Sequence, residues 1–575
     1  MKKIAILSPL VILMASTSLA QDSCIVRPSC ADMGYTKTID DCTGKTTLKC
    51  PFDLTAVSCS ASEAAVECDW GYKLASDNSC KKIENAIAFV VETTINNGSI
   101  TLATGSTNNF TVDWGDGTVE NYTNTSAPSH SYATAGQYPI IITGTVPSFK
   151  VSTLTNCNTI KILNADLESV TSYAASSGSS TFGKCSNATG EIPQKLSPNL
   201  ETATRMFYGC SGLYGDIPEL PSTITAATYM FYNCSGLTGE IKSLPSGISN
   251  GSYMFYGCKN LTGSIPNLPS SLTNGSSMFA GSTKLTGFNF SAFPTSLANG
   301  TSMFAQCTGL TGSIPELPNS LSNANSMFNG CTSLTGIGSS KFPTSLTDGY
   351  MMFYNCYKLT GNVPSLANTK LTDGRGMFYN CWRLTGNVPE LPSTLTNVRS
   401  ISSHSTDTGK SMFGSSGFTG IVPKLSHTSI TDATDMFYNT DISGITDFPR
   451  GLTTATNMFR SCENLSSIGD LPSGLTEYYN MFTFSSLTSI GNLPTNITDL
   501  QRMFENCRKL TSLPANFASL TSLTNIMDAF SGCTSLTGTL PPYSNYPSLT
   551  NYYVRAFEGT QLTNNTSSPW PDDAW

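Results

Sequence analysis

The sequence is dominated by one repeat. The dipeptide Met-Phe occurs thirteen times between residues 206 and 503, at intervals of 22–25 residues apart from a single interval of 35. Three less regular copies extend the array to sixteen units, and they are centred on Phe182, Phe530 and Phe557. A fixed period of 20–50 residues is typical of a solenoid, in which each coil packs only on its neighbours. The array therefore predicts a mainly β solenoid of about sixteen coils over residues 151–575.

Each coil is expected to contain one short strand and one tight turn. A typical unit reads Met230-Phe-Tyr-Asn-Cys-Ser-Gly-Leu-Thr-Gly-Glu-Ile-Lys-Ser-Leu-Pro. The alternating apolar residues predict a strand that joins a parallel sheet along the solenoid. The prolines, such as Pro218, Pro266 and Pro315, limit its paired part to three to five residues. We expect Met-Phe-x-x-Cys to form a single helical turn on the opposite wall, with Leu, Ile, Met and Phe in one continuous core.

The nineteen cysteines fall into two groups. Seven crowd between Cys24 and Cys80, which predicts a small disulfide-bonded module over residues 21–82 whose pairing the sequence does not determine. The other twelve lie in the array, where Ser or Thr replaces cysteine in several units. Cys462 has no cysteine in either adjacent unit, so disulfide pairing cannot be the general purpose of this position. We expect a buried structural ladder; scattered disulfides or a metal are the alternatives.

The first twenty residues have the pattern of a signal peptide. Lys2 and Lys3 precede an apolar run of eleven residues, and Ser18-Leu19-Ala20 offers the small residues required for cleavage. Eleven residues make a helix of about 16 Å, too short for a bilayer core of about 30 Å. We expect export by a cleavable signal peptide, an extracellular or cell-surface location, and no direct membrane span.

The composition bears on partners and catalysis. Charged residues make up 12% of the chain, and the net charge is −8. An acidic chain without a basic run is not expected to bind nucleic acid. The three histidines, His130, His404 and His427, occur in unrelated contexts, and the sequence contains no nucleophile elbow, His-Glu-x-x-His or phosphate loop. We predict no enzymatic activity, no cofactor and no metal site.

Residues 84–150 predict an antiparallel β domain. Asp116-Gly117 lies between two extended runs and favours a tight hairpin. Trp114 is expected in the core, and Tyr138–Ile142 is expected to form a closing strand. The motifs Trp-Gly-Asp-Gly and His-x-Tyr…Gly-x-Tyr resemble those of polycystic-kidney-disease (PKD)-type domains, so the resemblance implies a PKD-like β-sandwich over these residues.

Two acidic residues and a histidine in this domain need an interpretation. Asp113 and Asp116 flank the expected turn, where a short carboxylate side chain can accept hydrogen bonds from nearby backbone N–H groups. We interpret both as turn residues, with calcium binding as the alternative. His130 is interpreted as a local hydrogen-bonding partner and not as a metal ligand.

The repeat array itself resembles a known family. The cadence Met-Phe-x-x-Cys-x-x-Leu-Thr-Gly is similar to that of the BspA-like leucine-rich repeat surface proteins of bacteria, and to the related repeat of mycoplasma surface lipoproteins. The resemblance covers about residues 151–566 and implies a leucine-rich-repeat-type solenoid associated with adhesion to host proteins or other bacteria. The chain departs from the mycoplasma pattern because Gln21, and not a lipidated cysteine, follows the expected cleavage point.

Two irregularities mark a candidate partner-binding region near residues 350–412. The 35-residue interval contains an extra segment near Val398–Lys410, and insertions into a solenoid form loops on one face, often the binding face. In the two preceding coils, stacking is expected to place Tyr357 beside Trp382 and Lys358 beside Arg383. Aromatic and Arg residues are enriched in binding hot spots. The candidate partner-binding residues are Tyr354, Tyr357, Lys358, Tyr379, Trp382, Arg383 and His404.

The interpretation that follows is an exported bacterial surface protein that binds a partner as adhesins do. The expected partner is a host or bacterial surface protein or a glycan. The alternative is a structural spacer or coat protein of the cell surface without a specific ligand, in which the aromatic residues pack the wall and the insertion is merely tolerated. The sequence leaves open the identity of the ligand, the oligomeric state and the means of retention at the surface.

Overall fold

The computed structural model describes most of the chain from residue 86 onward. The described residues are 36–39, 46–49, 72–74, 80–82, 86–102, 104, 109–146, 160–165, 167, 181–399 and 410–575. Four strands precede residue 86, pairing as two antiparallel ladders: β1 (Thr36–Ile39) with β2 (Thr46–Lys49), and β3 (Tyr72–Leu74) with β4 (Cys80–Lys82). The expected signal peptide, and most of the expected disulfide module, lie outside the described residues.

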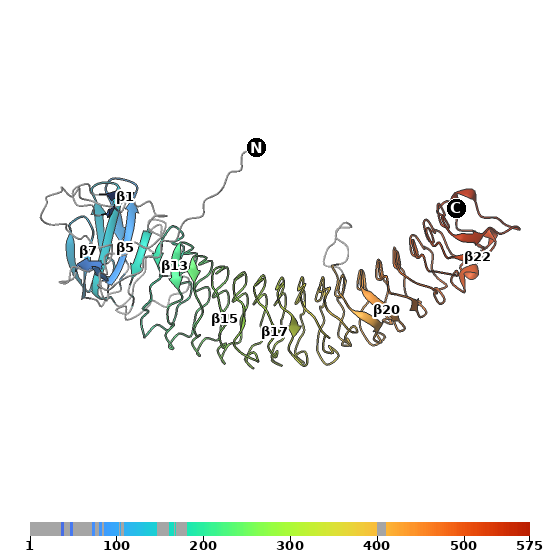
Figure 1. The fold of residues 1–575 in the computed structure, drawn as a ribbon, viewed down its shortest axis with the longest axis horizontal. Helices are drawn as coiled ribbons and strands as arrows, with labels where there is room; N and C mark the ends of the chain where they lie inside the picture. Colours follow the sequence, from blue (N-terminus) through green and yellow to red (C-terminus); the bar gives the residue numbers. More distant parts are fainter. Residues whose placement is uncertain are drawn as a thin grey trace.

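Two antiparallel sheets form the unit that precedes the solenoid (Figure 1). The larger sheet has the strand order β11-β5-β10-β7-β8, and β6 pairs with β9 in the smaller one. Trp114 and Tyr132 are fully buried in the core of this unit, and the Tyr132 hydroxyl donates to the Trp114 carbonyl oxygen. The strands are β5 (Ala86–Thr93), β6 (Gly98–Thr101), β7 (Asn109–Asp113), β8 (Val119–Thr123), β9 (Ser129–Tyr132), β10 (Gly136–Thr145) and β11 (Ile160–Ala165).

The predicted hairpin is present between β7 and β8, and Trp114 is in the core as expected. The turn requires glycine at position 115, because its φ is +80° and a Cβ atom there would lie 2.1 Å from the Pro139 carbonyl oxygen. The segment Tyr138–Ile142 is a strand, but β10 lies in the middle of the sheet instead of closing it. The sheet also extends past residue 150, because β11 pairs with β5.

From residue 181 the chain winds into a long, curved solenoid that ends at the C-terminus (Figure 1). Parallel pairing between successive coils confirms the predicted sheet. Most strands have only two residues, fewer than the predicted three to five, because Pro266 and Pro315 follow β15 and β17 directly and have no N–H to donate. The solenoid strands are β12 (Gly190–Glu191), β13 (Leu213–Asp216), β14 (Leu237–Thr238), β15 (Ser264–Ile265), β16 (Gly287–Phe288), β17 (Ser313–Ile314), β18 (Gly336–Ile337), β19 (Thr419–Val422), β20 (Asp441–Ile445), β21 (Ser467–Ile468), β22 (Thr537–Thr539) and β23 (Gln561–Thr563).

The segment Met-Phe-x-x-Cys is not a helical turn, so that prediction is wrong. Its backbone N–H groups donate alternately within the coil and to the next coil. The Tyr208 N–H donates to the Arg205 carbonyl at 3.2 Å, whereas the Phe207 N–H donates to the Met230 carbonyl at 2.9 Å. This alternation requires positive φ twice per coil, at the residues before Met and before Cys, as at Tyr229 (φ 60°) and Asn233 (φ 56°). We call this side of the solenoid the turn wall.

The sixteen repeat phenylalanines form one unbroken column through the core. Adjacent rings are stacked, with centroids 5.2–6.0 Å apart from Phe182 to Phe557. The extra segment of the 35-residue interval does not interrupt the column, because Phe378 and Phe413 remain stacked at 5.9 Å. The column confirms the sixteen predicted coils and their shared core.

The cysteines of the array form the predicted buried ladder. Ten of them, from Cys210 to Cys533, are free and buried, whereas Cys185 is disulfide-bonded. The thiols donate to the phenylalanine carbonyl of the preceding coil, as Cys234 Sγ does to Phe207 O at 3.0 Å. Ser282 replaces a cysteine and makes the same bond, to Phe255 O at 2.9 Å. The position therefore satisfies a buried carbonyl group.

Aromatic residues near the C-terminus cover the last coil. Trp570 is buried, packs at 5.1 Å against the Phe557 ring, and donates from Nε1 to the Pro541 carbonyl. The Trp575 ring lies 5.9 Å from the same phenylalanine. Three short 3₁₀ helices lie in the final coils: η2 (Phe517–Ser519), η3 (Tyr543–Asn545) and η4 (Asp572–Ala574). These contacts shield the end of the phenylalanine column from water.

Candidate partner-binding surface

Trp382 and Arg383 form the most exposed aromatic contact on the turn wall. The Trp382 side chain is 56% exposed, although the preceding Cys381 is buried. The Arg383 guanidinium carbon lies 5.4 Å from the centroid of the Trp382 ring, within the range of a cation–π interaction. A large apolar side chain that stays in water beside a cation gains from being covered by a partner.

Two tyrosines stack on the coil of this pair and the coil before it. The rings of Tyr354 and Tyr379, one coil apart, have centroids 4.9 Å apart. Asn380 Nδ2 donates to Asn355 Oδ1 at 3.0 Å, which ties together the two turns that carry them. The predicted residues Tyr354, Tyr379, Trp382 and Arg383 are therefore gathered on two adjacent coils.

Arg375 adds a fixed cation to the same two coils. Its guanidinium donates to both carboxylate oxygens of Asp373 and lies 5.1 Å from the centroid of the Tyr350 ring. The hydrogen bonds with Asp373, together with the attraction of its charge, raise the pKa of Arg375. The sequence analysis did not single out Arg375 and Tyr350, although both belong to this surface.

The other predicted residues are less closely involved. Tyr357 is half-buried and Lys358 is exposed, but no ring contact joins Tyr357 to Trp382 among the described residues. The expected placement of Tyr357 beside Trp382 stays a prediction, and the Trp382 ring contacts Arg383. His404 lies outside the described residues. The extra segment leaves and rejoins the coil at one point, where the Met412 N–H donates to the Val398 carbonyl at 3.0 Å.

A second aromatic cluster, which the sequence analysis missed, lies on the turn wall several coils earlier. We call it the tyrosine ladder. Ring centroids are 4.7 Å apart for Tyr208 and Tyr232, 4.8 Å for Tyr232 and Tyr256, and 4.6 Å for Tyr229 and Tyr253. Partial burial is the main cause that raises the pKa of Tyr229 and Tyr232. The signal in the sequence is the tyrosine after Phe in three consecutive units.

The two aromatic clusters are separated by coils with small side chains. At the position after the repeat phenylalanine, Ala280, Ala305 and Asn329 replace tyrosine before it returns at Tyr354. Arg205 lies 5.3 Å from the Tyr229 ring centroid, so both clusters combine aromatic rings with a guanidinium group. One wall of the solenoid therefore presents two aromatic surfaces of similar chemistry.

Three findings on the described residues concern metal binding, thiol reactivity and membrane spans. They contain no group of three or more His, Cys, Asp or Glu side chains placed to hold a metal ion. Burial raises the pKa of the Cys258 thiol to about 12, which keeps it protonated and unreactive at neutral pH. In the part of the chain that can be described, no helix has the length and apolar character needed to cross a membrane.

The residues around the N-terminal hairpin make local contacts. Asp113 and Asp116 each accept a backbone N–H within the turn, from Gly115 and Thr118, both at 3.0 Å. His130 Nε2 lies 2.7 Å from the second Asp116 carboxylate oxygen. The interpretation of these residues as turn formers with a local histidine partner is confirmed.

Comparison with protein families identifies the repeat. Six copies of the repeat described as the BspA type leucine rich repeat region match this chain, over residues 127–238, 175–311, 393–511 and 457–568. Together these segments cover more than half of the chain. The chain belongs to this family. Residues 294–391 of this BspA type protein also match a family described as a Mycoplasma protein of unknown function.

Other comparisons add less to this assignment. No curated protein matches the chain. Among solved structures, a leucine-rich repeat protein from Bacteroides ovatus is 18% identical, and the match covers 72% of this chain and 88% of that protein, with a TM-score of 0.35. The BspA type assignment agrees with the resemblance noted from the Met-Phe-x-x-Cys-x-x-Leu-Thr-Gly cadence.

Proposed function

We propose that this BspA type protein is exported to the bacterial cell surface and binds a protein or glycan partner there, as adhesins do. The observation that carries the proposal is the Trp382–Arg383 pair, because Trp382 remains 56% exposed with a cation held over its ring. Trp and Arg are among the residues most enriched in interface hot spots. Covering this pair would remove apolar surface from water and leave the guanidinium donors free for a partner.

Three further observations support binding through the turn wall. Two stacked tyrosines lie on the coil that carries Trp382 and the coil before it, and a second aromatic cluster occurs in earlier coils. In the sequence, the extra segment follows the coil that carries Trp382. The fold is a repeat scaffold, a class that binds along extended surfaces, so we propose neither an enzymatic activity nor a cofactor.

The N-terminal units are proposed to present the solenoid. The Trp-Gly-Asp-Gly sequence forms the turn of a buried hairpin in a two-sheet unit, which supports a PKD-like domain. The cysteine pattern supports a disulfide-bonded module before it, and the first twenty residues support a cleavable signal peptide.

A structural spacer or coat protein without a specific ligand is the second candidate. The unbroken phenylalanine column favours it, because such a core keeps a long rod in shape whether or not its wall binds a ligand. The elongated outline in Figure 1 is that of a rod. A spacer, however, does not require the aromatic residues to gather in two clusters.

Binding assays on the full exported chain distinguish these functions. Arrays of host matrix proteins, bacterial surface proteins and glycans would be probed with the wild-type chain and with Trp382→Ala. Tyr552→Ala is the control, because Tyr552 is a similarly exposed aromatic residue, 55% exposed, near the C-terminus. We expect Trp382→Ala to weaken binding at least about thirtyfold, the loss typical of a hot spot, and Tyr552→Ala to leave it unchanged. Equal binding by all three chains would move the binding surface elsewhere, and no binding to any array would favour the spacer.

A further inference from the structure

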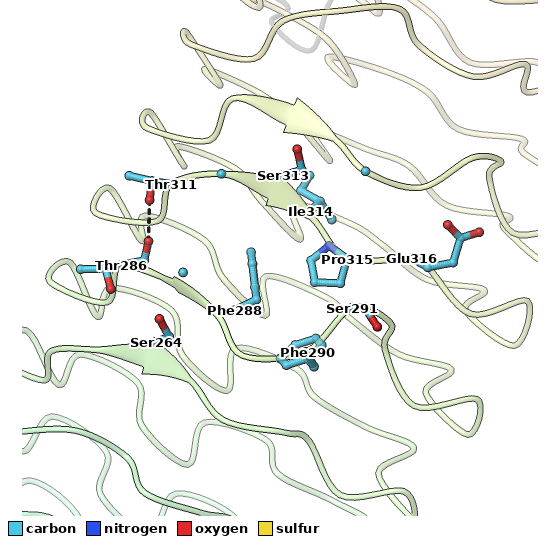
Figure 2. Close-up of a pocket in the computed structure, with 13 residues that line it drawn as sticks. Ser264, Thr286, Phe288, Phe290, Ser291, Thr311, Ser313, Ile314, Pro315 and Glu316 are labelled. Atoms are coloured by element: carbon cyan, nitrogen blue, oxygen red, sulfur yellow. Dashed lines mark hydrogen bonds between the residues drawn. The ribbon is translucent and has the colours of Figure 1, made fainter.

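A groove opens on the strand side of the solenoid between the coils of β16 and β17 (Figure 2). Within the described solenoid, β16 pairs with β15 and β17 pairs with β18, but no strand pairing joins β16 to β17. The cavity volume is about 570 Å³. This volume lies within the range of about 300–1,000 Å³ that is common for ligand-binding clefts.

Along the groove, backbone hydrogen bonds join the two coils at its two ends. At one end the Thr311 N–H donates to the Thr286 carbonyl at 2.9 Å, and at the other the Glu316 N–H donates to the Ser291 carbonyl at 2.9 Å. Between these bonds, one coil carries Gly-Phe-Asn-Phe where its neighbours carry Ser-Ile-Pro. The two phenylalanines lie where the neighbouring coils have a smaller strand segment, and the coil of β17 does not pair with β16 beside them.

Several hydroxyl groups line the groove, and one of them, that of Thr311, donates to the Thr286 carbonyl at 2.8 Å. Many threonine side chains on the neighbouring coils donate to the carbonyl of the preceding coil, as Thr360 does to Thr335 O at 2.7 Å. Among the described residues, by contrast, no hydrogen-bond partner is found for four hydroxyl groups that line the groove. They belong to Ser264, Thr286, Ser291 and Ser313. These groups are free to bond a ligand.

Two phenylalanine rings line the groove, and Glu316 lies at one end of it. Phe288 and Phe290 are half-buried, with ring centroids 5.5 Å apart and planes at 71°, and both rings line the groove in Figure 2. Glu316 is held in place by the next coil, because the Ser340 N–H and hydroxyl donate to its two carboxylate oxygens at 3.1 and 3.3 Å. The remaining lone pairs of that carboxylate can accept further hydrogen bonds.

We propose that this groove binds a pyranose unit of a neutral glycan. A pyranose ring combines an apolar C–H face, which packs on aromatic rings, with hydroxyl groups, which donate to a carboxylate and exchange hydrogen bonds with Ser and Thr. No basic residue lines the groove, so an anionic ligand would meet only the Glu316 charge. An ammonium ion could also pair with a carboxylate beside aromatic rings, but it would leave the four free hydroxyl groups unused.

This inference names a ligand class for the glycan branch of the proposed function, and it concerns a different surface. It is tested on the full exported chain by electrophoresis in gels that contain neutral polysaccharides, followed by calorimetry with hexasaccharides of glucose or mannose. Glu316→Gln removes the carboxylate charge. Glu219→Gln is the matched control, because Glu219 also lies in a Pro-Glu-Leu sequence, two residues after an Ile, in a coil outside the groove.

A second variant is designed to block the groove without altering the two phenylalanine rings. Gly287→Leu fills the groove at low cost, since a Cβ atom at Gly287 would meet only the Ser264 hydroxyl, at 3.5 Å. We expect at least one neutral hexasaccharide to bind, with binding weakened about tenfold by Glu316→Gln and abolished by Gly287→Leu. The control Glu219→Gln and the Trp382→Ala variant should bind that sugar as the wild type does.

Three results would overturn the inference. These are the absence of binding to every neutral polysaccharide, equal losses in Glu316→Gln and Glu219→Gln, and binding of butylammonium in place of sugars. A negative result for the groove does not count against partner binding through Trp382, because the partner-binding arrays test that surface separately. Loss of array binding in Trp382→Ala alone would support the proposed function without this groove.

Discussion

Replacing Phe255 by alanine tests whether the phenylalanine column stabilises the solenoid. The Phe255 ring is fully buried and lies 5.4 Å from the Phe231 ring and 5.6 Å from the Phe279 ring. Removing a buried phenylalanine costs about 3–5 kcal/mol in the free energy of unfolding, since the surrounding core closes only partly around the cavity. Both stacked contacts, each worth about 0.5–1.5 kcal/mol, are lost within that total.

The effect should be local as well as large. Each coil contacts only its neighbours, so a weakened coil divides the array into two blocks that open independently. Hydrogen–deuterium exchange measured by mass spectrometry should show faster exchange of the backbone amides in the mutated coil and the adjacent coils. The C-terminal coils, capped by Trp570, should exchange as in the wild type.

The neighbouring Tyr256 provides the control. It follows Phe255 in the same turn, but its ring is half-buried and stacks at the surface against Tyr232. We expect Tyr256→Ala to cost no more than about 1 kcal/mol, because its half-buried ring contacts only Tyr232 and Tyr253 among the described rings. The reasoning would be refuted if Phe255→Ala cost as little as Tyr256→Ala, or if its effect on exchange spread uniformly along the solenoid.

Two further predictions concern thiols and pH. Burial raises the pKa of the ladder cysteine Cys258 to about 12. Its thiol should therefore resist iodoacetamide at pH 8 in the native chain and react fully in guanidinium, as measured by mass spectrometry. Rapid labelling of the native chain would contradict this burial. The hydrogen bond from Lys161, which lies 2.7 Å from Glu92, lowers the pKa of Glu92 below its ordinary 4.5. Because the folded-state pKa is the lower one, this pair stabilises the fold above pH 4.5 and stops doing so as the pH falls through the lowered pKa. Glu92→Gln should therefore lower the free energy of unfolding at pH 7, measured by urea titration, by under about 1 kcal/mol for so exposed a pair. The two chains should converge as the pH falls through the lowered pKa of Glu92.

The sequence predicted the repeat and the core well, because both depend on periodic side chains. The spacing of thirteen Met-Phe pairs and three less regular copies identified the sixteen coils. The replacement of cysteine by Ser282 indicated a buried ladder, and the hydrogen bond of Ser282 agrees with it. The conformation of the turn could not be derived in this way. Positive φ at Tyr229 is unfavourable for the isolated residue and is stabilised by hydrogen bonds from the next coil, which the local sequence does not reveal.

The candidate surfaces were predicted only in part. Trp382 and Arg383 were singled out because matching positions in adjacent units carry aromatic and basic residues, whereas the contact between these two neighbours was not predicted. The tyrosine ladder was not predicted, because a tyrosine that follows Phe in several units reads as an ordinary part of the repeat. The groove was overlooked because Phe288 and Phe290 have the composition of core residues, and only the loss of pairing between β16 and β17 places them at the surface.

The closure of the coil at Val398 and Met412 has a consequence for variation and engineering. The two ends of the extra segment are joined by a hydrogen bond, and the phenylalanine column passes them unchanged. Lengthening a flexible loop raises the entropy cost of closing it only slowly, by about 0.6 kcal/mol per doubling of its length. The same point recurs in every coil, just before the repeat methionine. The solenoid thus provides a series of equivalent grafting positions, at which foreign peptides can be displayed in register without redesigning the interior.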